Sequence, residues 1–94
     1  GKIKMLKHQN QALDLGFSDI KAHRTSTRFL YFTTDTPLPL QSATFEVRLF
    51  EGIQLVSCTL TVTAIEHGQY VGEYTTTQEA ELVLRFFQSL RYKE

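Results

Sequence analysis

Hydrophobic and polar residues alternate with a period of two over most of the chain, which is typical of β-strands with one buried face. This alternation, with a dense aromatic run at its centre, predicts strands at residues 12–18, 20–23, 28–34, 42–50, 53–65 and 69–75. The Glu51-Gly52 pair and residues 66–68 are expected to form tight turns, because glycine readily adopts positive φ. Pro37 should end the strand before it, since proline has no N–H to give to the ladder.

The period changes near the C-terminal end, where apolar residues recur at helical spacing. The residues that follow the i, i+3, i+4, i+7 pattern of one helical face are Val83, Phe86, Phe87 and Leu90. Residues 76–79 read Thr-Thr-Gln-Glu, which is the spacing of a capping box with Thr76 as the N-cap and Glu79 reaching back. A helix over residues 77–90 is therefore predicted.

A run of strands followed by one helix predicts a mainly β fold. We expect a small antiparallel β-barrel of five to six strands with one C-terminal α-helix, because rolling up the sheet removes its exposed edges. Residues 12–94 should form this single domain. Residues 1–11 are polar and carry Lys2, Lys4 and Lys7 without an acidic residue, which predicts a basic N-terminal arm.

The composition is that of an ordinary globular domain, and it narrows the functional classes. Of the 94 residues, 41% are hydrophobic and 21% are charged, and the formal net charge is zero. A zero balance argues against DNA binding driven by overall charge, so no DNA partner is expected. No apolar stretch reaches the roughly 18 residues of a membrane span. The single cysteine, Cys58, lies on an apolar face and cannot form an intramolecular disulfide. We therefore expect a cytoplasmic protein with an inert core thiol.

The sequence contains no arrangement of residues that is typical of an enzyme. It has no glycine-rich phosphate loop, no nucleophile elbow and no His-Glu-x-x-His motif. Its histidines are scattered, whereas a metal site needs several convergent ligands. We therefore expect neither catalysis nor a cofactor.

The segment from His23 to Arg28 is the strongest candidate for a binding site. Arg24 and Arg28 offer planar guanidinium groups that match phosphate oxygens, and Ser26 places a hydroxyl between them. On a strand these three candidate ligand-binding residues would share one face, because they are two residues apart. The alternative is a polar, exposed strand entry whose arginines cover neighbouring aromatic surface.

From about residue 26 to residue 90 the chain resembles a PilZ domain. Residues 29–40 read Phe-Leu-Tyr-Phe-Thr-Thr-Asp-Thr-Pro-Leu-Pro-Leu, which is similar to a strand of that family followed by its Thr-Asp-x-Pro-Leu-Pro connector. Residues 68–74 read Gly-Gln-Tyr-Val-Gly-Glu-Tyr and resemble the glycine-containing aromatic strand that precedes the family's C-terminal helix. PilZ domains are small β-barrels, and many are receptors for the bacterial second messenger cyclic di-GMP.

The ligand motifs of the family are an Arg-x-x-x-Arg pair and, after it, Asp/Asn-x-Ser-x-x-Gly. Residues 24–28 have the spacing of the first motif, but the alignment of the downstream strands places residues 24–29 on the second. In that alignment only Ser26 is kept, since Arg24 replaces the acid or amide and Phe29 replaces the glycine. The upstream region then offers lysines in place of arginines, and lysine lacks the bidentate geometry of a guanidinium.

The resemblance implies a PilZ-like regulatory or binding domain of bacterial cyclic di-GMP signalling with a degenerate nucleotide site. Such a domain would act through protein–protein contacts, and cyclic di-GMP would bind weakly or not at all. The alternative is an unrelated small β-barrel module that binds a protein, a peptide or a nucleic acid. The sequence leaves open the identity of the partner and the oligomeric state.

Overall fold

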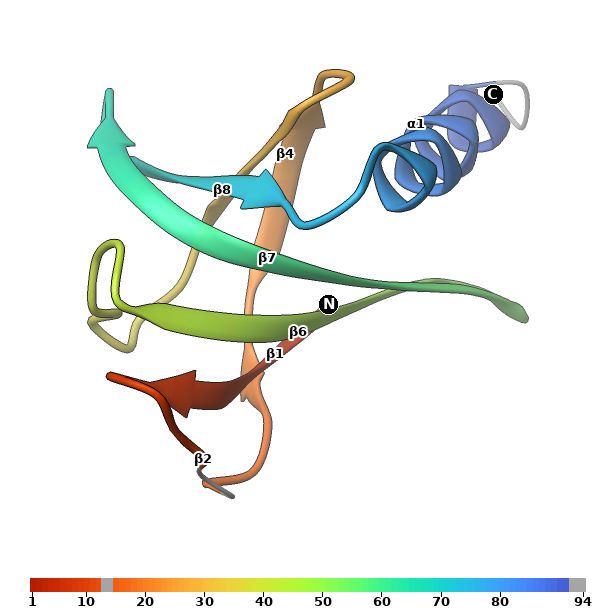
Figure 1. Cartoon of the computed structure of the whole chain (residues 1–94). Coiled ribbons are helices and arrows are strands. Elements are labelled where there is room, and N and C mark those ends of the chain that lie inside the picture. The colour runs from red at the N-terminus through yellow and green to blue at the C-terminus, as the bar shows by residue number, and fades with distance from the viewer. Residues whose placement is uncertain (13–14, 92–94) are drawn as a thin grey trace.

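The computed structural model of the protein describes residues 1–12 and 15–91 (Figure 1). Its elements are β1 (Lys2–His8), β2 (Gln11–Ala12), β3 (Ser18–Asp19), β4 (Lys21–Thr25), β5 (Phe29–Thr33), β6 (Ala43–Glu51), β7 (Gln54–Glu66), β8 (Gln69–Tyr74) and α1 (Thr77–Arg91). Strands dominate the described residues and one helix follows them, which confirms the mainly β fold with a C-terminal helix.

The strands form one curved antiparallel sheet in the order β2-β1-β6-β7-β8-β5-β4. β3 lies off this path and pairs with β1 only through Lys2↔Asp19 and Ile3↔Ser18. At Ile20, which exchanges two backbone hydrogen bonds with Gly1, the chain turns from this pairing to the pairing of β4 with β5. The sheet is not closed into a barrel, so that part of the fold prediction is not confirmed. Among the described residues, strand pairing links the β1 side of the sheet to the β4 side only over the short β3 segment.

Residues 1–11 do not form a separate basic arm. β1 lies inside the sheet and pairs with β6 from Lys2↔Arg48 to His8↔Ala43. Ile3 is buried in the core, and Lys2 forms an ion pair with Asp19. The apolar residues that alternate with the lysines therefore favour a strand inside the sheet. Their burial is favourable, and the lysine side chains still reach water, so the charges do not prevent it.

The strand expected over residues 12–18 is not formed in the part of it that the structure describes. Residues 15–17 have no strand pairing, and Gly16 has φ of 79°, which interrupts an extended backbone. Leu13 and Asp14 lie outside the described residues. The Phe17 ring lies on the outside of the sheet, 4.5 Å from the guanidinium carbon of Arg48, and this cation–π contact replaces the expected burial.

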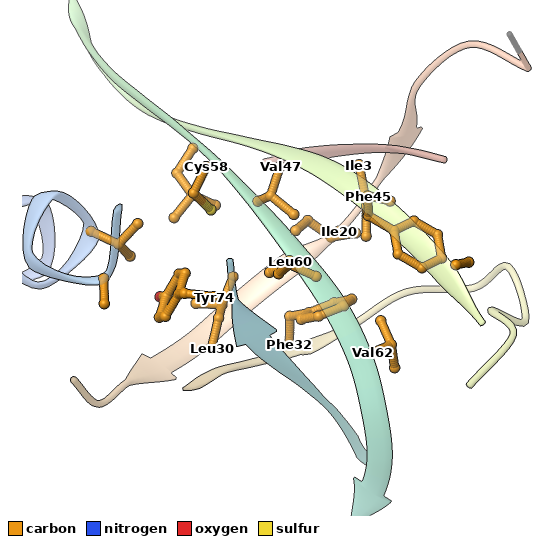
Figure 2. Packing of buried hydrophobic residues seen from close by; sticks show 14 residues of the cluster. Ile3, Ile20, Leu30, Phe32, Phe45, Val47, Cys58, Leu60, Val62 and Tyr74 are labelled. Carbon is orange, nitrogen blue, oxygen red and sulfur yellow. The ribbon is translucent and has the colours of Figure 1, made fainter. Parts of the chain in front are cut away.

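The core lies on the inner face of the curved sheet, and α1 packs against one end of it, near Cys58 and Tyr74 (Figure 2). Its largest fully buried side chains are Leu30, Phe32, Phe45, Val47, Leu60, Val62 and Val83. Cys58 is buried on the same face as predicted, and burial raises the pKa of its thiol to about 12. Gly72 leaves room for the core, since a Cβ at this position would come within 2.8 Å of the Leu60 side chain, which would have to shift.

The helix begins as the sequence predicts. Thr76 is its N-cap, because the Thr76 Oγ1 accepts a hydrogen bond from the Glu79 N–H at 3.2 Å. The Glu79 carboxylate also reaches the Thr76 hydroxyl, but its Oε1 accepts the backbone N–H of Thr59 on β7 at 3.0 Å. Glu79 therefore joins α1 to β7 instead of completing a capping box on the Thr76 backbone. The described residues contain no helix that is long and apolar enough to cross a membrane.

Candidate functional site

The candidate residues Arg24, Ser26 and Arg28 lie around the turn between β4 and β5. β4 ends at Thr25 and β5 begins at Phe29, so Ser26 and Arg28 are not part of a strand. The spacing that would place all three side chains on one strand face therefore does not apply here. The turn instead brings each of the three into a different set of contacts.

Ser26 holds the turn together. Its Oγ accepts the backbone N–H groups of Arg28 at 3.2 Å and Phe29 at 3.0 Å, and its own N–H donates to the Phe29 carbonyl oxygen at 2.8 Å. These bonds satisfy two donors that a tight turn would otherwise leave to water. The Ser26 hydroxyl is thus engaged in the backbone of the turn.

Thr25 ties the same turn to the interior. Its Oγ1 lies 2.6 Å from the hydroxyl oxygen of Tyr74, at the end of β8. Burial of Tyr74 raises the pKa of its phenol above the ordinary range, although the bond to Thr25 acts in the other direction. This pair fixes the turn against the end of the sheet where α1 starts.

The Arg24 guanidinium lies flat against an aromatic neighbour. Its central carbon is 3.7 Å from the centre of the Tyr31 ring, and Arg24 and Tyr31 are directly paired residues of β4 and β5. A guanidinium at this distance is held by the ring quadrupole and covers the apolar face of the ring. The alternative to a ligand site was a strand entry whose arginines cover neighbouring aromatic surface. Arg24 makes such a contact with Tyr31.

Arg28 is engaged by an acidic side chain. Its Nε lies 2.6 Å from Oε2 of Glu73 on β8, and its guanidinium carbon is 5.3 Å from the centre of the Phe29 ring. The negative charge of the Glu73 carboxylate already balances the positive charge of Arg28. A phosphate at Arg28 would therefore have to compete with Glu73. An open depression of about 370 Å³ beside this pair is lined by Thr27, Arg28, Glu73, Tyr74, Thr75, Thr76 and Thr77.

Phe29 occupies the position where the resemblance places a glycine. It is the first residue of β5, pairs with Glu73 of β8, and has no positive φ. Its half-buried ring lies 6.5 Å from the ring of Tyr31 on the outer side of the sheet. The backbone here has the extended conformation that any residue adopts, and a side chain stands where a glycine would leave space.

The remaining polar groups that the sequence singled out are dispersed. His23 lies on β4, where its Nε2 is 2.8 Å from Oγ1 of Thr33 on β5. Among residues 1–12 and 15–91, no three or more His, Cys, Asp or Glu side chains are grouped in a way that could hold a metal ion.

A second exposed region lies at the end of the β6–β7 hairpin, which extends past the end of β8 (Figure 1). Phe50 and Leu55 are paired residues of this hairpin, and both are about half exposed. Ile53 at the turn is fully exposed, with 103% relative accessibility. The period-two alternation of β6 puts Phe50 on the face opposite the buried Val47 and Leu49. The sequence pattern gives no signal that β8 stops short of Leu55.

No family model, no curated protein and no solved structure matches the chain.

Proposed function

We propose that the protein is a PilZ-like regulatory or binding domain of bacterial cyclic di-GMP signalling, in the cytoplasm, whose nucleotide site is degenerate and which acts through contacts with protein. The observation that carries the proposal is the set of contacts that the β4–β5 turn makes within the chain. Arg24 is stacked on Tyr31, Arg28 is paired with Glu73, and the Ser26 hydroxyl accepts two backbone N–H groups. Each of these three side chains already has a partner within the chain.

The energetic reasoning favours weak or absent nucleotide binding. A phosphate would gain a bidentate contact that uses Nε of Arg28 only after this Nε leaves Glu73. Arg24 lies over Tyr31, where its in-plane N–H groups keep their donors but its position is fixed by the ring. The phosphate would also meet the negative charge of Glu73 on the neighbouring strand. The exposed apolar end of the β6–β7 hairpin supports the other half of the proposal, since exposed clusters of large apolar side chains are typical of protein contact sites.

The test is a calorimetric titration with cyclic di-GMP of the wild type, of Arg24→Ala/Arg28→Ala, and of Lys7→Ala as a control that removes an exposed cation from another strand. We expect no heat of binding at micromolar concentrations in any of the three proteins. Micromolar or tighter binding by the wild type and Lys7→Ala, lost in the double variant, would overturn the degenerate-site proposal and assign the site to the two arginines.

A second candidate function rests on the aromatic side chains next to these arginines. Phe29 and Tyr31 lie side by side on the outer side of β5, and a guanidinium flanks each ring. Aromatic rings interleaved with arginines favour stacking of single-stranded bases, which is the function expected of an unrelated β module. A single-stranded oligonucleotide in the same titration distinguishes the two: binding that falls in Tyr31→Ala and with rising salt would favour nucleic acid over the PilZ-like proposal.

A further inference from the structure

An apolar cavity of about 140 Å³ lies between β1, the segment that leads into β3, and the connector from β5 to β6. Figure 2 shows one of its lining residues, Phe45, at the end of the core that lies away from α1. Ile3 and Met5 of β1 and Leu38 of the connector also line it. None of the described residues that line the cavity carries a charge. A charged ligand would lose its hydration there without gaining an opposite charge, so the cavity suits an uncharged one.

Two contacts hold the walls of this cavity in place. On one side Ser18 pairs with Ile3, in the short pairing of β3 with β1. On the other side the Leu38 N–H donates to the Tyr70 hydroxyl oxygen at 3.0 Å, and the Tyr70 ring is stacked on Phe32 of the core. Because the walls are fixed before a ligand enters, binding costs little conformational entropy of the protein.

The floor and the mouth of the cavity differ in exposure. Ile3 and Phe45 are buried core residues and form its floor, whereas Leu15 and Thr36 are exposed and lie at its mouth. Apolar walls give water few hydrogen-bond partners, and a cavity of about 150 Å³ lined by Leu, Ile and Phe side chains binds benzene. The volume of this cavity is therefore close to that of a site for one six-membered ring.

We infer that this cavity binds a small, uncharged aromatic molecule of about six to eight non-hydrogen atoms. Met5 favours an aromatic ring, because a thioether is adaptable in shape and makes favourable contacts with ring edges. Ser18 and Thr36 are the polar side chains of the described lining, and neither hydroxyl forms a hydrogen bond among the described residues. A ligand with one hydroxyl group, such as a phenol, therefore suits the cavity best. The inference goes beyond the proposed function, since no residue of the β4–β5 turn lines this cavity.

The first test is a titration with phenol that is followed by NMR at Met5. Met5 is the only methionine of the chain, so protein labelled with ¹³C at the methionine methyl group gives one signal, and this signal comes from the cavity wall. We expect the signal to shift and to saturate with a dissociation constant of about 1 mM or tighter. We also expect a nuclear Overhauser effect between the Met5 methyl group and the ring protons of phenol. No saturation up to about 10 mM phenol, or no Overhauser effect, would overturn the inference.

The second test fills the cavity. Leu38→Phe adds a ring at the cavity wall, and the matched control Leu40→Phe adds the same ring to an exposed residue of the same connector. We expect phenol to bind about tenfold more weakly, or not at all, to Leu38→Phe and to bind Leu40→Phe as it binds the wild type. Equal binding by the two variants, each with an unchanged circular dichroism spectrum, would overturn the inference. If Leu38→Phe does not fold, the Overhauser effect at Met5 in the wild type decides.

Two further probes define the class of ligand. Benzoate carries a negative charge on the same ring, and cyclohexanol carries the hydroxyl group on a ring that is not aromatic. We expect both to bind more weakly than phenol, benzoate by about tenfold or more, because its charge finds no partner in the cavity. Benzoate binding as tight as that of phenol would overturn the assignment to an uncharged ligand, and equal binding of cyclohexanol would overturn the assignment to an aromatic one.

Discussion

The β4–β5 turn and the end of the β6–β7 hairpin are both exposed, but their chemical groups are in opposite states. At the turn, Ser26 and Arg28 carry polar groups that have partners within the chain. At the hairpin end, Phe50, Ile53 and Leu55 expose large apolar side chains. The comparison teaches that polar side chains alone do not mark a binding site. Large apolar side chains that are left exposed are the better guide.

The largest effect is expected from Glu79, which joins α1 to β7. Glu79→Ala removes the acceptor of the Thr59 N–H, and hydrogen bonds to charged groups contribute about 1.5–3 kcal/mol to the free energy of unfolding. Urea denaturation should show a loss of that size. Glu81→Ala, on the exposed side of the same helix, is the control and should change the free energy of unfolding little. Equal losses in the two variants would mean that the contact with β7 is unimportant.

The next effect tests whether the turn is held by Ser26. Ser26→Ala leaves the N–H groups of Arg28 and Phe29 without their acceptor and should lower the free energy of unfolding by about 1 kcal/mol. Thr27→Ala changes an exposed residue of the same turn and is the control, with an expected change below about 0.5 kcal/mol. An unchanged free energy of unfolding in Ser26→Ala would mean that the Ser26 hydroxyl does not hold the turn and is available to a ligand.

A smaller effect is expected for the two arginines. Arg28→Ala breaks an ion pair in which Arg28 is 71% exposed, and exposed pairs contribute about 0–1 kcal/mol. Arg24→Ala removes an exposed cation–π contact of about 0.5–1 kcal/mol. Thermal melts at low and high salt should show that the Arg28 effect is screened by salt more than the Arg24 effect. The opposite order would mean that Arg24 is held by charge and not by Tyr31.

The smallest effect on stability is expected at the hairpin end itself. Leu55→Lys changes a side chain that is already half exposed, so the free energy of unfolding of the monomer should change by less than about 0.5 kcal/mol. Urea denaturation of the variant and the wild type measures this change. A larger loss would mean that Leu55 packs within its own chain and is not part of a free surface.

Much of the fold could be predicted from the sequence, because most of the strands and the helix carry strong local signals. The alternation in β6 and β7, the turn at Gly52 and the Thr76 N-cap all lie where the pattern placed them. β1 was missed because its lysines dominate the composition, while its pairing with β6 depends on residues about 40 positions away. The strand at residues 12–18 was expected from an alternation that Gly16 interrupts.

The candidate site was predictable in its residues but not in their contacts. The sequence brought out Arg24, Ser26 and Arg28, yet it could not reveal that Glu73 on β8 would lie beside Arg28, since that pairing depends on the register of β5 with β8. Likewise, Leu55 is exposed beyond the point where β8 ends opposite Leu60, and no residue of β7 itself signals this exposure.

The most direct test of this comparison is a pair of backbone amide NMR spectra, recorded with and without cyclic di-GMP. The account predicts that the nucleotide leaves the amide signals of Ser26, Arg28 and Phe29 in place. Nucleotide-induced shifts at the β4–β5 turn would contradict it.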